Sequence, residues 1–326
     1  MIPEEKIQQL FQKIGHIVQS YSFLGKGEAS VIIKVKTDQG TYALKTALYP
    51  KRKDKVLREA QFRTFFIEKE LTCIPHPIHI DSEIFPNGAV IYEYAEGSKP
   101  DFISKEILIQ FAQIIGKIHK IDFEIISDGY TQIQNMVQSL EKTINSIKTR
   151  YPHLLNSLIE KAFANAVEEY KQKISDKQDL FTIGINAQLH GDLSDNYVVD
   201  KNGKIWLIDW ENSERGDVLD ELCWFLFVND VKPENHSLFF QEYQKSFPSA
   251  QKINIEKLTG FYFAVTPVFN ICWGIDQLDM NIKQKLEPDR KLRDLAHSAN
   301  NWSEFYSETT TSLIIKGIET LKQKLS

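Results

Sequence analysis

A short stretch, residues 189–217, gathers acids and an amide at spacings that could hold a metal ion beside a reacting hydroxyl. It reads LHGDLSDNYVVDKNGKIWLIDWENSERGD. Asp192 follows a glycine on a short loop, where a carboxylate can orient a substrate hydroxyl and accept its proton. Asn196 and Asp209 offer oxygen atoms, which are the ligands that magnesium prefers. The stretch therefore predicts Asp192 as a catalytic base and Asn196 and Asp209 as magnesium ligands, although each aspartate alone could cap a turn.

A second group of candidates lies far upstream. Gly25 and Gly27 separate two strand-like runs, and exposed amides in such a loop favour phosphate oxygens, although ordinary hairpins also contain glycines. Lys45 lies between apolar residues in the middle of a strand, so its charge needs a partner, and Glu59 on the next helix is available. Protein kinases hold the α- and β-phosphates of ATP with this arrangement. The alternative is an edge lysine beside an unrelated glutamate.

The composition is that of a globular protein whose main partner is not nucleic acid. The chain has 326 residues, of which 42% are hydrophobic and 25% are charged. This length favours two lobes with a cleft between them, where ligands commonly bind. The formal net charge of -5 provides no basic excess for a nucleic-acid partner. The three cysteines are isolated in the sequence, and we expect them to be reduced and buried.

The N-terminal sequence does not resemble a targeting segment. It reads MIPEEKIQQLFQKIGHIV, with early acids and helically spaced apolar residues instead of a basic start and a continuous apolar core. We expect no run apolar and long enough to span a membrane. These features indicate a cytoplasmic protein without a membrane partner.

Periodicity predicts a β-rich first part and a helical second part, an α+β class. The first part should contain an N-terminal amphipathic helix, an antiparallel meander over residues 21–48, a helix over 54–71, a loop at the two prolines of IPHPIHI, and a strand over 88–97. The predicted N-terminal helix carries Ile7, Leu10, Phe11, Ile14 and Val18. The second part should be helical from residue 103, with a hairpin around the turn KNGK at 201–204.

These motifs together resemble the aminoglycoside phosphotransferase and choline kinase family, which has a two-lobed, protein-kinase-like fold. FLGKGEAS resembles the family's nucleotide loop, YALK its lysine strand, and REAQFRTFF the helix with the partner glutamate. VIYEYAEG is similar to its hinge, FAQIIGKIHKID to a C-lobe helix, LHGDL to its catalytic loop and LIDWE to its metal-binding strand end. The resemblance covers nearly the whole chain. LHGDL and LIDWE, with their short separation, carry most of its specificity.

The resemblance implies an ATP- and magnesium-dependent enzyme that phosphorylates a hydroxyl of a small molecule. It implies a nucleotide-binding lobe over 1–96 and a helical lobe over 97–326 that holds the catalytic loop, the metal site and the acceptor pocket. The backbone from Gly25 to Ser30 would cover the phosphates, and the backbone from Glu93 to Ala95 would meet the adenine. Trp273 and Asp276 become candidates for binding a cationic acceptor, because the family's C-terminal helices wall that pocket.

One departure from the family's pattern leaves alternatives open. The family usually places asparagine five positions after the catalytic aspartate, but here that position is Tyr197 and the asparagine, Asn196, comes one earlier. If the loop tightens, Asn196 can still reach the metal; otherwise Asp195 substitutes, or the protein is a nucleotide-binding regulator with little turnover. A serine/threonine protein kinase is a third hypothesis, but no segment resembles the one from DFG to APE. Neither the acceptor nor the oligomeric state follows from the sequence.

Overall fold

The computed structural model describes residues 2–26, 30–194, 196–283, 289–302 and 305–325. Gly27 of the predicted phosphate loop and Asp195 lie outside the described residues. The chain divides into two compact units, and each is described by itself. The first comprises Met1–Phe123, Ala187–Gly216 and Val231–Pro248, and the second comprises Glu124–Asn186, Asp217–Asp230 and Ser249–Ser326. The lobe boundary expected after residue 96 stays a prediction.

A five-stranded antiparallel sheet forms the core of the first unit. Its strand order is β1-β2-β3-β5-β4. The strands are β1 (Val18–Lys26), β2 (Ser30–Thr37), β3 (Thr41–Ala47), β4 (Pro77–Asp81) and β5 (Ala89–Glu93). The predicted meander corresponds to β1, β2 and β3. Strand β4 was not predicted, because its prolines were read as a loop; Pro77 is its first residue and β4 is an edge strand, where a missing N–H is tolerated.

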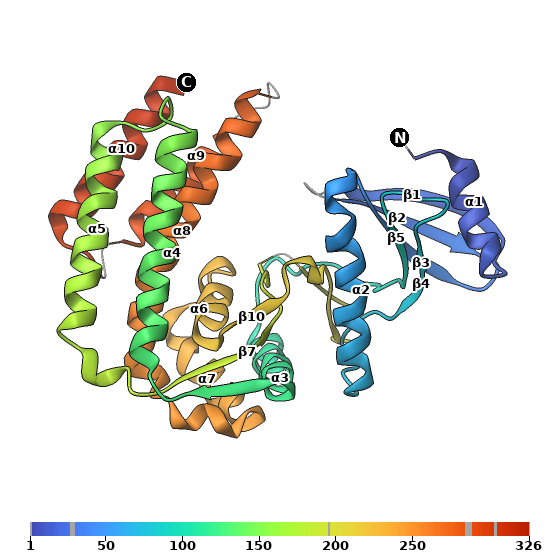
Figure 1. Ribbon diagram of the computed structural model, residues 1–326, viewed down its shortest axis with the longest axis horizontal. Helices are drawn as coiled ribbons and strands as arrows, with labels where there is room; N and C mark the ends of the chain where they lie inside the picture. The colour runs from blue at the N-terminus through green and yellow to red at the C-terminus, as the bar shows by residue number, and fades with distance from the viewer. Residues whose placement is uncertain (1, 27–29, 195, 284–288, 303–304, 326) are drawn as a thin grey trace. The chain divides into compact units, whose positions relative to one another are not determined.

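Two helices cover opposite faces of this sheet (Figure 1). Helix α1 (Glu4–Lys13) packs Ile7, Leu10 and Phe11 on one face, and α2 (Lys53–Glu68) packs on the other. Because side chains alternate along a strand, each central strand contributes to both layers. The predicted N-terminal helix is too long: α1 ends at Lys13, Gly15 follows with φ +76°, and Val18 begins β1.

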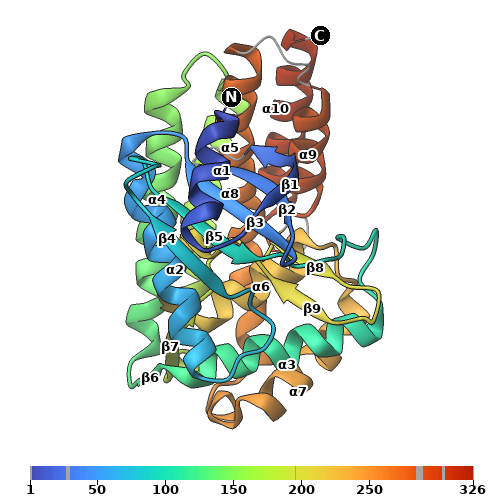
Figure 2. The same cartoon turned by 90° about the vertical axis from the view of Figure 1, so that its right-hand side faces the viewer.

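The first unit also contains a helix pair and a hairpin. Helices α3 (Lys105–Ile121) and α7 (His236–Ser246) lie side by side (Figure 2). They approach so closely that a Cβ on Gly116 would lie 2.9 Å from the Tyr243 carbonyl oxygen. Strands β8 (Tyr197–Val199) and β9 (Ile205–Leu207) pair antiparallel, which confirms the predicted hairpin. A 3-10 helix, η3 (Trp210–Asn212), follows β9.

Three further strands were not predicted. They are β6 (Phe123–Ile126), β7 (Gly184–Leu189) and β10 (Glu214–Asp217), and they form a sheet of order β10-β7-β6. β6 and β10 have four residues each, and β7 is buried at five of its six positions, so none of the three shows a clear alternation of buried and exposed residues.

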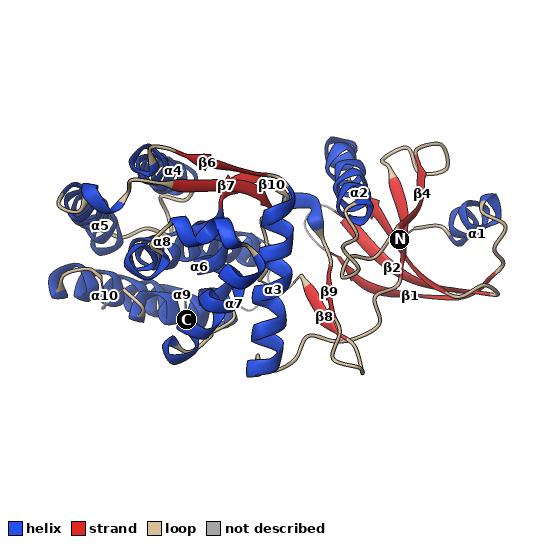
Figure 3. Cartoon of the chain, turned by 90° about the horizontal axis from the view of Figure 1, so that it is seen from below, coloured by secondary structure: helices blue, strands red, loops and turns tan. Residues whose placement is uncertain are grey.

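The second unit is mostly helical, as predicted for this part of the chain (Figure 3). Helix α8 contacts α4, α5, α6 and α9, and α10 packs against α5 and α9. Its helices are α4 (Gly129–Arg150), α5 (Ser157–Ser175), α6 (Val218–Val228), α8 (Ile255–Lys283), α9 (Asp289–Asn300) and α10 (Glu308–Leu325).

Helix α8 corrects one expectation from the sequence. It contains an 18-residue window with a mean hydropathy of 1.4, so by length and composition one helix of the described residues could cross a membrane. However, 72% of that window is buried inside the structure. A helix that is apolar on all sides is typical of a protein core as well as of a membrane span, and α8 is buried among the neighbouring helices.

The three cysteines are buried and free, as predicted. Burial raises the pKa of Cys73 to about 11 and that of Cys272 to about 12. Their thiolates are therefore scarce at neutral pH, and these residues act as small apolar side chains in the core.

A half-buried acid lies at the start of α6. Asp217 caps the helix, accepting a hydrogen bond of 2.9 Å from the Leu219 N–H and another from the Tyr262 hydroxyl. Burial raises the pKa of Asp217 to about 7, although both hydrogen bonds favour its charged form. Because this pKa lies above the ordinary value, the folded state holds a proton that the unfolded state releases near pH 3.8. The resulting stability is present at low pH and is lost as the pH rises through 7.

We expect the Asp217→Asn variant to have a flatter dependence of stability on pH. Asparagine retains the cap but does not titrate. Between pH 5.5 and pH 8 the wild-type protein should lose about 2 kcal/mol of unfolding free energy that the variant keeps. Urea denaturation at both pH values measures this difference, and equal losses in the two proteins would contradict it.

Candidate active site

Lys45 is the centre of a buried ionic cluster in the first unit. Its side chain leaves the middle of β3 on the face that α2 covers, and its Nζ lies 2.6 Å from Glu59 Oε2 and 2.7 Å from Asp209 Oδ1. Lys45 is 2% exposed and Glu59 is fully buried. The lysine–glutamate pair expected from the sequence therefore forms, and the predicted metal ligand Asp209 joins it.

The cluster keeps its charges despite burial. Burial alone would lower the pKa of Lys45, but the carboxylates of Glu59, Asp209 and Glu211 outweigh this effect and raise it above its ordinary value. Burial would raise the pKa of Glu59, but Lys45 and the contacting Arg63 guanidinium lower it to about 2. Both members of the pair are therefore ionised at neutral pH, as a group that binds phosphates through its positive charge requires.

Asp209 is held in an unusual backbone conformation. Its φ is +59° and its ψ is +65°, the left-handed region, which costs free energy for a residue with a side chain. The segment is fixed on both sides: the Ile208 N–H donates to the Asn196 carbonyl oxygen at 2.9 Å, and Trp210 is fully buried against Phe66. Tertiary packing thus turns the Asp209 carboxylate toward Lys45.

Glu211 belongs to the same cluster, although no role for it was predicted from the sequence. Its Oε2 lies 3.2 Å from Lys45 Nζ, but this buried oxygen makes no hydrogen bond of good geometry with the described residues. One carboxylate oxygen each from Glu59, Asp209 and Glu211 lies within 4.8 Å of the others, a grouping that could hold a metal ion. The available signal was its place two residues after Asp209 in LIDWE.

The loop after β7 holds Asp192 through local hydrogen bonds. Ser194 Oγ donates to Asp192 Oδ1 at 2.7 Å, a contact not anticipated from the sequence. The Asp192 N–H donates to His190 Nδ1 at 3.4 Å, so His190 carries its proton on Nε2, which donates to the Ile208 carbonyl oxygen at 2.9 Å. His190 therefore supports this loop through hydrogen bonds.

Gly191 is required by the path of this loop. Its φ is +81°, and a Cβ at this position would lie 2.2 Å from the Asn212 carbonyl oxygen. Backbone approach of the two segments therefore excludes any side chain here. Ser213 tightens the same junction by donating from Oγ to the Leu189 carbonyl oxygen at 2.6 Å. The loop that carries Asp192 and the segment after Asp209 are thus packed as one piece.

Asn196 comes four positions after Asp192 instead of five, and its side chain contacts the loop that carries Asp192. Asn196 Nδ2 donates to the Asp192 carbonyl oxygen at 2.9 Å, so its amide oxygen remains available as an acceptor. Tyr197, which takes the position where the family usually has asparagine, begins β8 and is 1% exposed. Its ring packs edge to face on Phe111 with centroids 4.6 Å apart. The asparagine therefore faces the catalytic loop and the tyrosine faces the core.

A cavity of about 320 Å³ lies beside this cluster. Its lining contains four of the predicted nucleotide-binding residues, Gly25, Lys45, Glu93 and Ala95. It also contains both predicted metal ligands, Asn196 and Asp209. The remaining lining residues are Leu24, Ile32, Ala43, Arg63, Pro75, Tyr92, Tyr94, Gly97, Val198 and Ile208. Arg63 and Tyr92 were not anticipated, because their place on this wall depends on how α2 packs against β5.

Of the predicted phosphate-binding loop, Gly25 lines the cavity and Ser30 does not. A Cβ on Gly25 would meet no atom within 4 Å, so the missing side chain leaves open space on the cavity wall. Ser30 is buried in β2 opposite Ala47 and does not line the cavity.

Trp273 and Asp276 lie on α8 in the second unit. Trp273 is 49% exposed, and the Lys291 ammonium lies 4.5 Å from the centre of its rings. Asp276 Oδ1 accepts a hydrogen bond of 3.0 Å from Arg150 Nη1 and another from the Tyr151 hydroxyl. The indole thus already faces a cation, whereas the carboxylate is neutralised by an arginine.

Comparison with known proteins gives matches at the level of family and fold. Residues 20–250 match the phosphotransferase enzyme family. A curated relative, the LicA homolog of Mycoplasma capricolum subsp. capricolum, is 21% identical over 176 residues, which are 54% of this chain. That match spans 63% of the relative's own length.

Several solved phosphotransferases share the fold. The choline kinase LicA from Streptococcus pneumoniae has a TM-score of 0.63 at 18% identity, covering 93% of this chain and 99% of that one. Aminoglycoside 2'-phosphotransferase-IIIa, in a GDP complex, has a TM-score of 0.62 at 15% identity, covering 94% and 97%. Spectinomycin phosphotransferase, in complex with ADP and spectinomycin, has a TM-score of 0.55 at 13% identity, covering 98% and 99%. The predicted α+β, protein-kinase-like fold is confirmed.

Proposed function

Because the chain belongs to the phosphotransferase enzyme family, we propose that it transfers the γ-phosphoryl group of ATP, with magnesium, to a hydroxyl of a small molecule. The observation that carries this proposal is the position of Lys45 Nζ, 2.6 Å from Glu59 and 2.7 Å from Asp209 beside a cavity. A buried lysine fixed by two carboxylates is suited to binding phosphates at a defined place.

The cavity next to Lys45 is the proposed nucleotide site. The backbone from Glu93 to Ala95 would hydrogen-bond the adenine, and Lys45 would bind the α- and β-phosphates. Structures that share the fold contain AMP, GDP and ADP, which supports a nucleotide substrate. The open space over Gly25 leaves room for a ligand against the backbone of β1.

The acidic end of the cavity fits a magnesium ion. Asp209 and Asn196 would supply oxygen ligands, and Glu211 would add another. The buried Glu211 oxygen, which lacks a well-formed hydrogen bond to the described residues, supports this fit because a cation would satisfy it. When bound, magnesium neutralises charge that develops on the phosphates.

Asp192 is the proposed group that aligns the acceptor hydroxyl. Its Oδ1 is occupied by Ser194, which leaves the second carboxylate oxygen for the acceptor. Because the transition state of phosphoryl transfer is loose, Asp192 contributes mainly by orientation and takes the proton late. The loop contacts of His190 and Gly191 hold this geometry before the substrate binds.

The acceptor is a small molecule by analogy with proteins of this fold, which include choline, aminoglycoside and spectinomycin kinases. Trp273 and Asp276 remain proposed contacts for a cationic acceptor. Such an acceptor would replace the Lys291 ammonium on the indole and would compete with Arg150 for the carboxylate. A cytoplasmic location without nucleic-acid or membrane partners remains part of the proposal.

The test is magnesium-dependent release of ADP from ATP in the presence of choline, aminoglycosides, spectinomycin and simple amino alcohols. We expect at least one hydroxyl-bearing acceptor to stimulate turnover and to appear as its phosphate ester by mass spectrometry. ATP binding without turnover on any acceptor would favour the regulator hypothesis. Phosphorylation of a serine peptide in preference to every small molecule would favour the protein kinase hypothesis.

We expect the Ser194→Ala variant to be slower without losing nucleotide affinity. Removing the hydroxyl frees Asp192 Oδ1 and allows the carboxylate to rotate, so kcat should fall by about 5- to 50-fold, less than for loss of a catalytic base. Ser194→Thr retains the hydroxyl and should recover most of this loss. Steady-state kinetics measures both variants, and an unchanged kcat for Ser194→Ala would remove Ser194 from the positioning of Asp192.

A further inference from the structure

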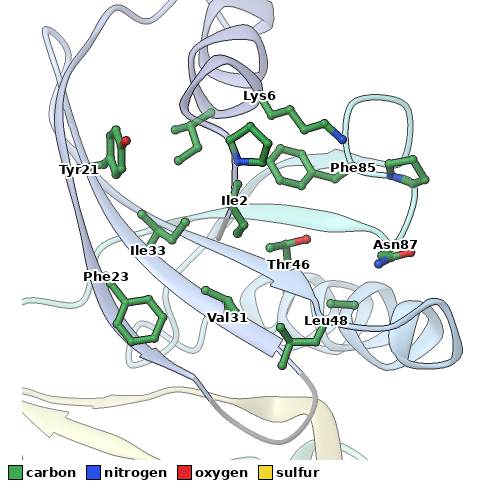
Figure 4. Close-up of a pocket in the computed structure, with 14 residues that line it drawn as sticks. Ile2, Lys6, Tyr21, Phe23, Val31, Ile33, Thr46, Leu48, Phe85 and Asn87 are labelled. Carbon is green, nitrogen blue, oxygen red and sulfur yellow. The ribbon is translucent and has the colours of Figure 1, made fainter.

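A second cavity does not belong to the proposed active site. It measures about 710 Å³, lies in the first unit, opens to solvent on one side, and is bordered by α1, the first three strands of the sheet and the loop before β5 (Figure 4). Its lining residues are Ile2, Pro3, Lys6, Ile7, Tyr21, Phe23, Val31, Ile33, Thr46, Ala47, Leu48, Phe85, Pro86 and Asn87. The volume is in the range of small-molecule sites.

This cavity and the nucleotide cavity lie on opposite faces of the same strands. In β2, Val31 and Ile33 line this cavity, while Ile32 between them lines the nucleotide cavity. In β3, Thr46 faces this cavity and Lys45 faces the nucleotide side. The alternation of side chains along a strand separates the two sites, so a nucleotide in one does not occupy the other.

The walls are suited to an apolar ligand. Apart from Lys6, Tyr21, Thr46 and Asn87, the lining side chains are hydrocarbon. Two of the polar side chains already have partners: Thr46 Oγ1 donates to the Gly88 carbonyl oxygen at 2.9 Å, and the Tyr21 hydroxyl donates to Glu4 at 3.2 Å. Phe23 is 63% exposed at the rim, which leaves apolar surface uncovered.

The remaining polar groups define one end of the cavity. Lys6 and Asn87 lie on the side away from Tyr21 and Phe23 (Figure 4). Lys6 Nζ pairs with no carboxylate of the described residues, and it lies 5.9 Å from the centroid of the Phe85 ring. Asn87 likewise makes no side-chain hydrogen bond within the described part of the chain. An ammonium and an amide at the end of an apolar cavity complement an anionic head group.

We propose that this cavity binds a small amphiphile with an apolar chain and a single carboxylate. The chain would lie between α1 and the sheet, against Val31 and Ile33, and the carboxylate would meet Lys6 and Asn87. Glu4, which accepts the hydrogen bond from the Tyr21 hydroxyl, lies at the Tyr21 end of the cavity, away from the proposed head group. The site is independent of the phosphotransfer reaction, so its existence does not depend on the proposed function.

The experiment compares three ligands of equal chain length by isothermal titration calorimetry on the whole protein: decanoate, decanol and decyltrimethylammonium, each below its micelle concentration. Decanoate should bind saturably, at least fivefold tighter than the other two. The Lys6→Gln variant should lose this preference, weakening decanoate at least fivefold and decanol less than twofold. Equal binding of the three ligands, or no saturable binding of decanoate, would overturn the proposal.

A matched pair of variants tests the place of binding. Phe23→Ser removes an exposed ring that lines the cavity, and Ile17→Ser removes an apolar side chain that is 70% exposed and does not line it. Because both are exposed, neither should lower the melting temperature appreciably. Phe23→Ser should weaken decanoate at least fivefold and Ile17→Ser less than twofold; equal effects of the two substitutions would rule out this cavity as the site.

Discussion

The Asp192→Asn variant should lose about 10²- to 10⁴-fold in kcat while its affinity for ATP stays within about twofold of the wild type. Asparagine has the same shape and can still accept the hydrogen bond from Ser194, so the loop should keep its conformation. It cannot take a proton from the acceptor or attract it by charge. Asp192 is not among the residues that line the nucleotide cavity, so ATP binding should persist.

Steady-state kinetics with the best acceptor measures the loss of kcat, and calorimetric titration with ATP measures the nucleotide affinity. Asp200→Asn is the matched control, because Asp200 accepts backbone hydrogen bonds of 2.8 and 3.0 Å in the turn between β8 and β9, and asparagine can accept them too. The control should retain wild-type kcat. Comparable turnover of Asp192→Asn and the wild type would show that Asp192 does not align the acceptor.

The Glu59→Ala variant should be destabilised by about 3–5 kcal/mol. Glu59 is fully buried, and its two oxygens hold Lys45 and Arg63, which are also buried. Removing the carboxylate leaves Arg63 without its ionic partner and Lys45 without one of its three. The cost is the desolvation of these cations, which is no longer offset by attraction to the acid.

Urea denaturation at pH 7 measures this loss. Glu68→Ala, on the same helix but exposed, should change stability by less than about 0.5 kcal/mol. If Glu59→Ala is as stable as Glu68→Ala, the buried ion pair contributes nothing to the fold. Reduced ATP affinity should accompany the loss of stability, because Lys45 is no longer held in place.

The dependence of stability on pH in the acid range also tests the Lys45–Glu59 pair. The folded-state pKa of Glu59 is about 2, below its ordinary value of 4.5, so its stabilising effect is present above pH 4.5 and is lost as the pH falls through 2. This difference corresponds to about 3 kcal/mol. Glu59→Gln cannot titrate, so between pH 5 and pH 2.5 it should lose less stability than the wild type in parallel urea titrations.

Much of the five-stranded sheet and of the Lys45–Glu59 pair could be predicted because the signals are local. The alternation and turn residues over 21–48 predict the meander, and the lysine within an apolar strand predicts a buried partner. Glu59 lies only 14 residues after Lys45, on the next helix, and the ion pair follows. The fold class followed from a β-rich beginning and a helical remainder.

Other features depend on contacts that leave no pattern in the chain. Strand β4 begins with a proline, which favoured a loop, while β6 and β10 are too short and β7 is too uniformly buried to show a period. The long apolar run in α8 is compatible with a membrane or with a core, and only its burial among other helices distinguishes the two.

By itself, the sequence determined which residue types the candidate site contains: a lysine within an apolar strand, an acidic loop, and carboxylate and amide oxygens that could bind a hard cation. Only the tertiary structure decided which carboxylate oxygens form ion pairs with the Lys45 ammonium. Asp209 reaches Lys45 across 164 residues of sequence, and Glu211, whose signal in the sequence is its place two residues after Asp209, joins them. The physical reason is that spacing along the chain reports hydrogen bonds and periodicity over a few residues, whereas an ion pair between distant segments depends on how the sheet, α2 and the segment after β9 pack together.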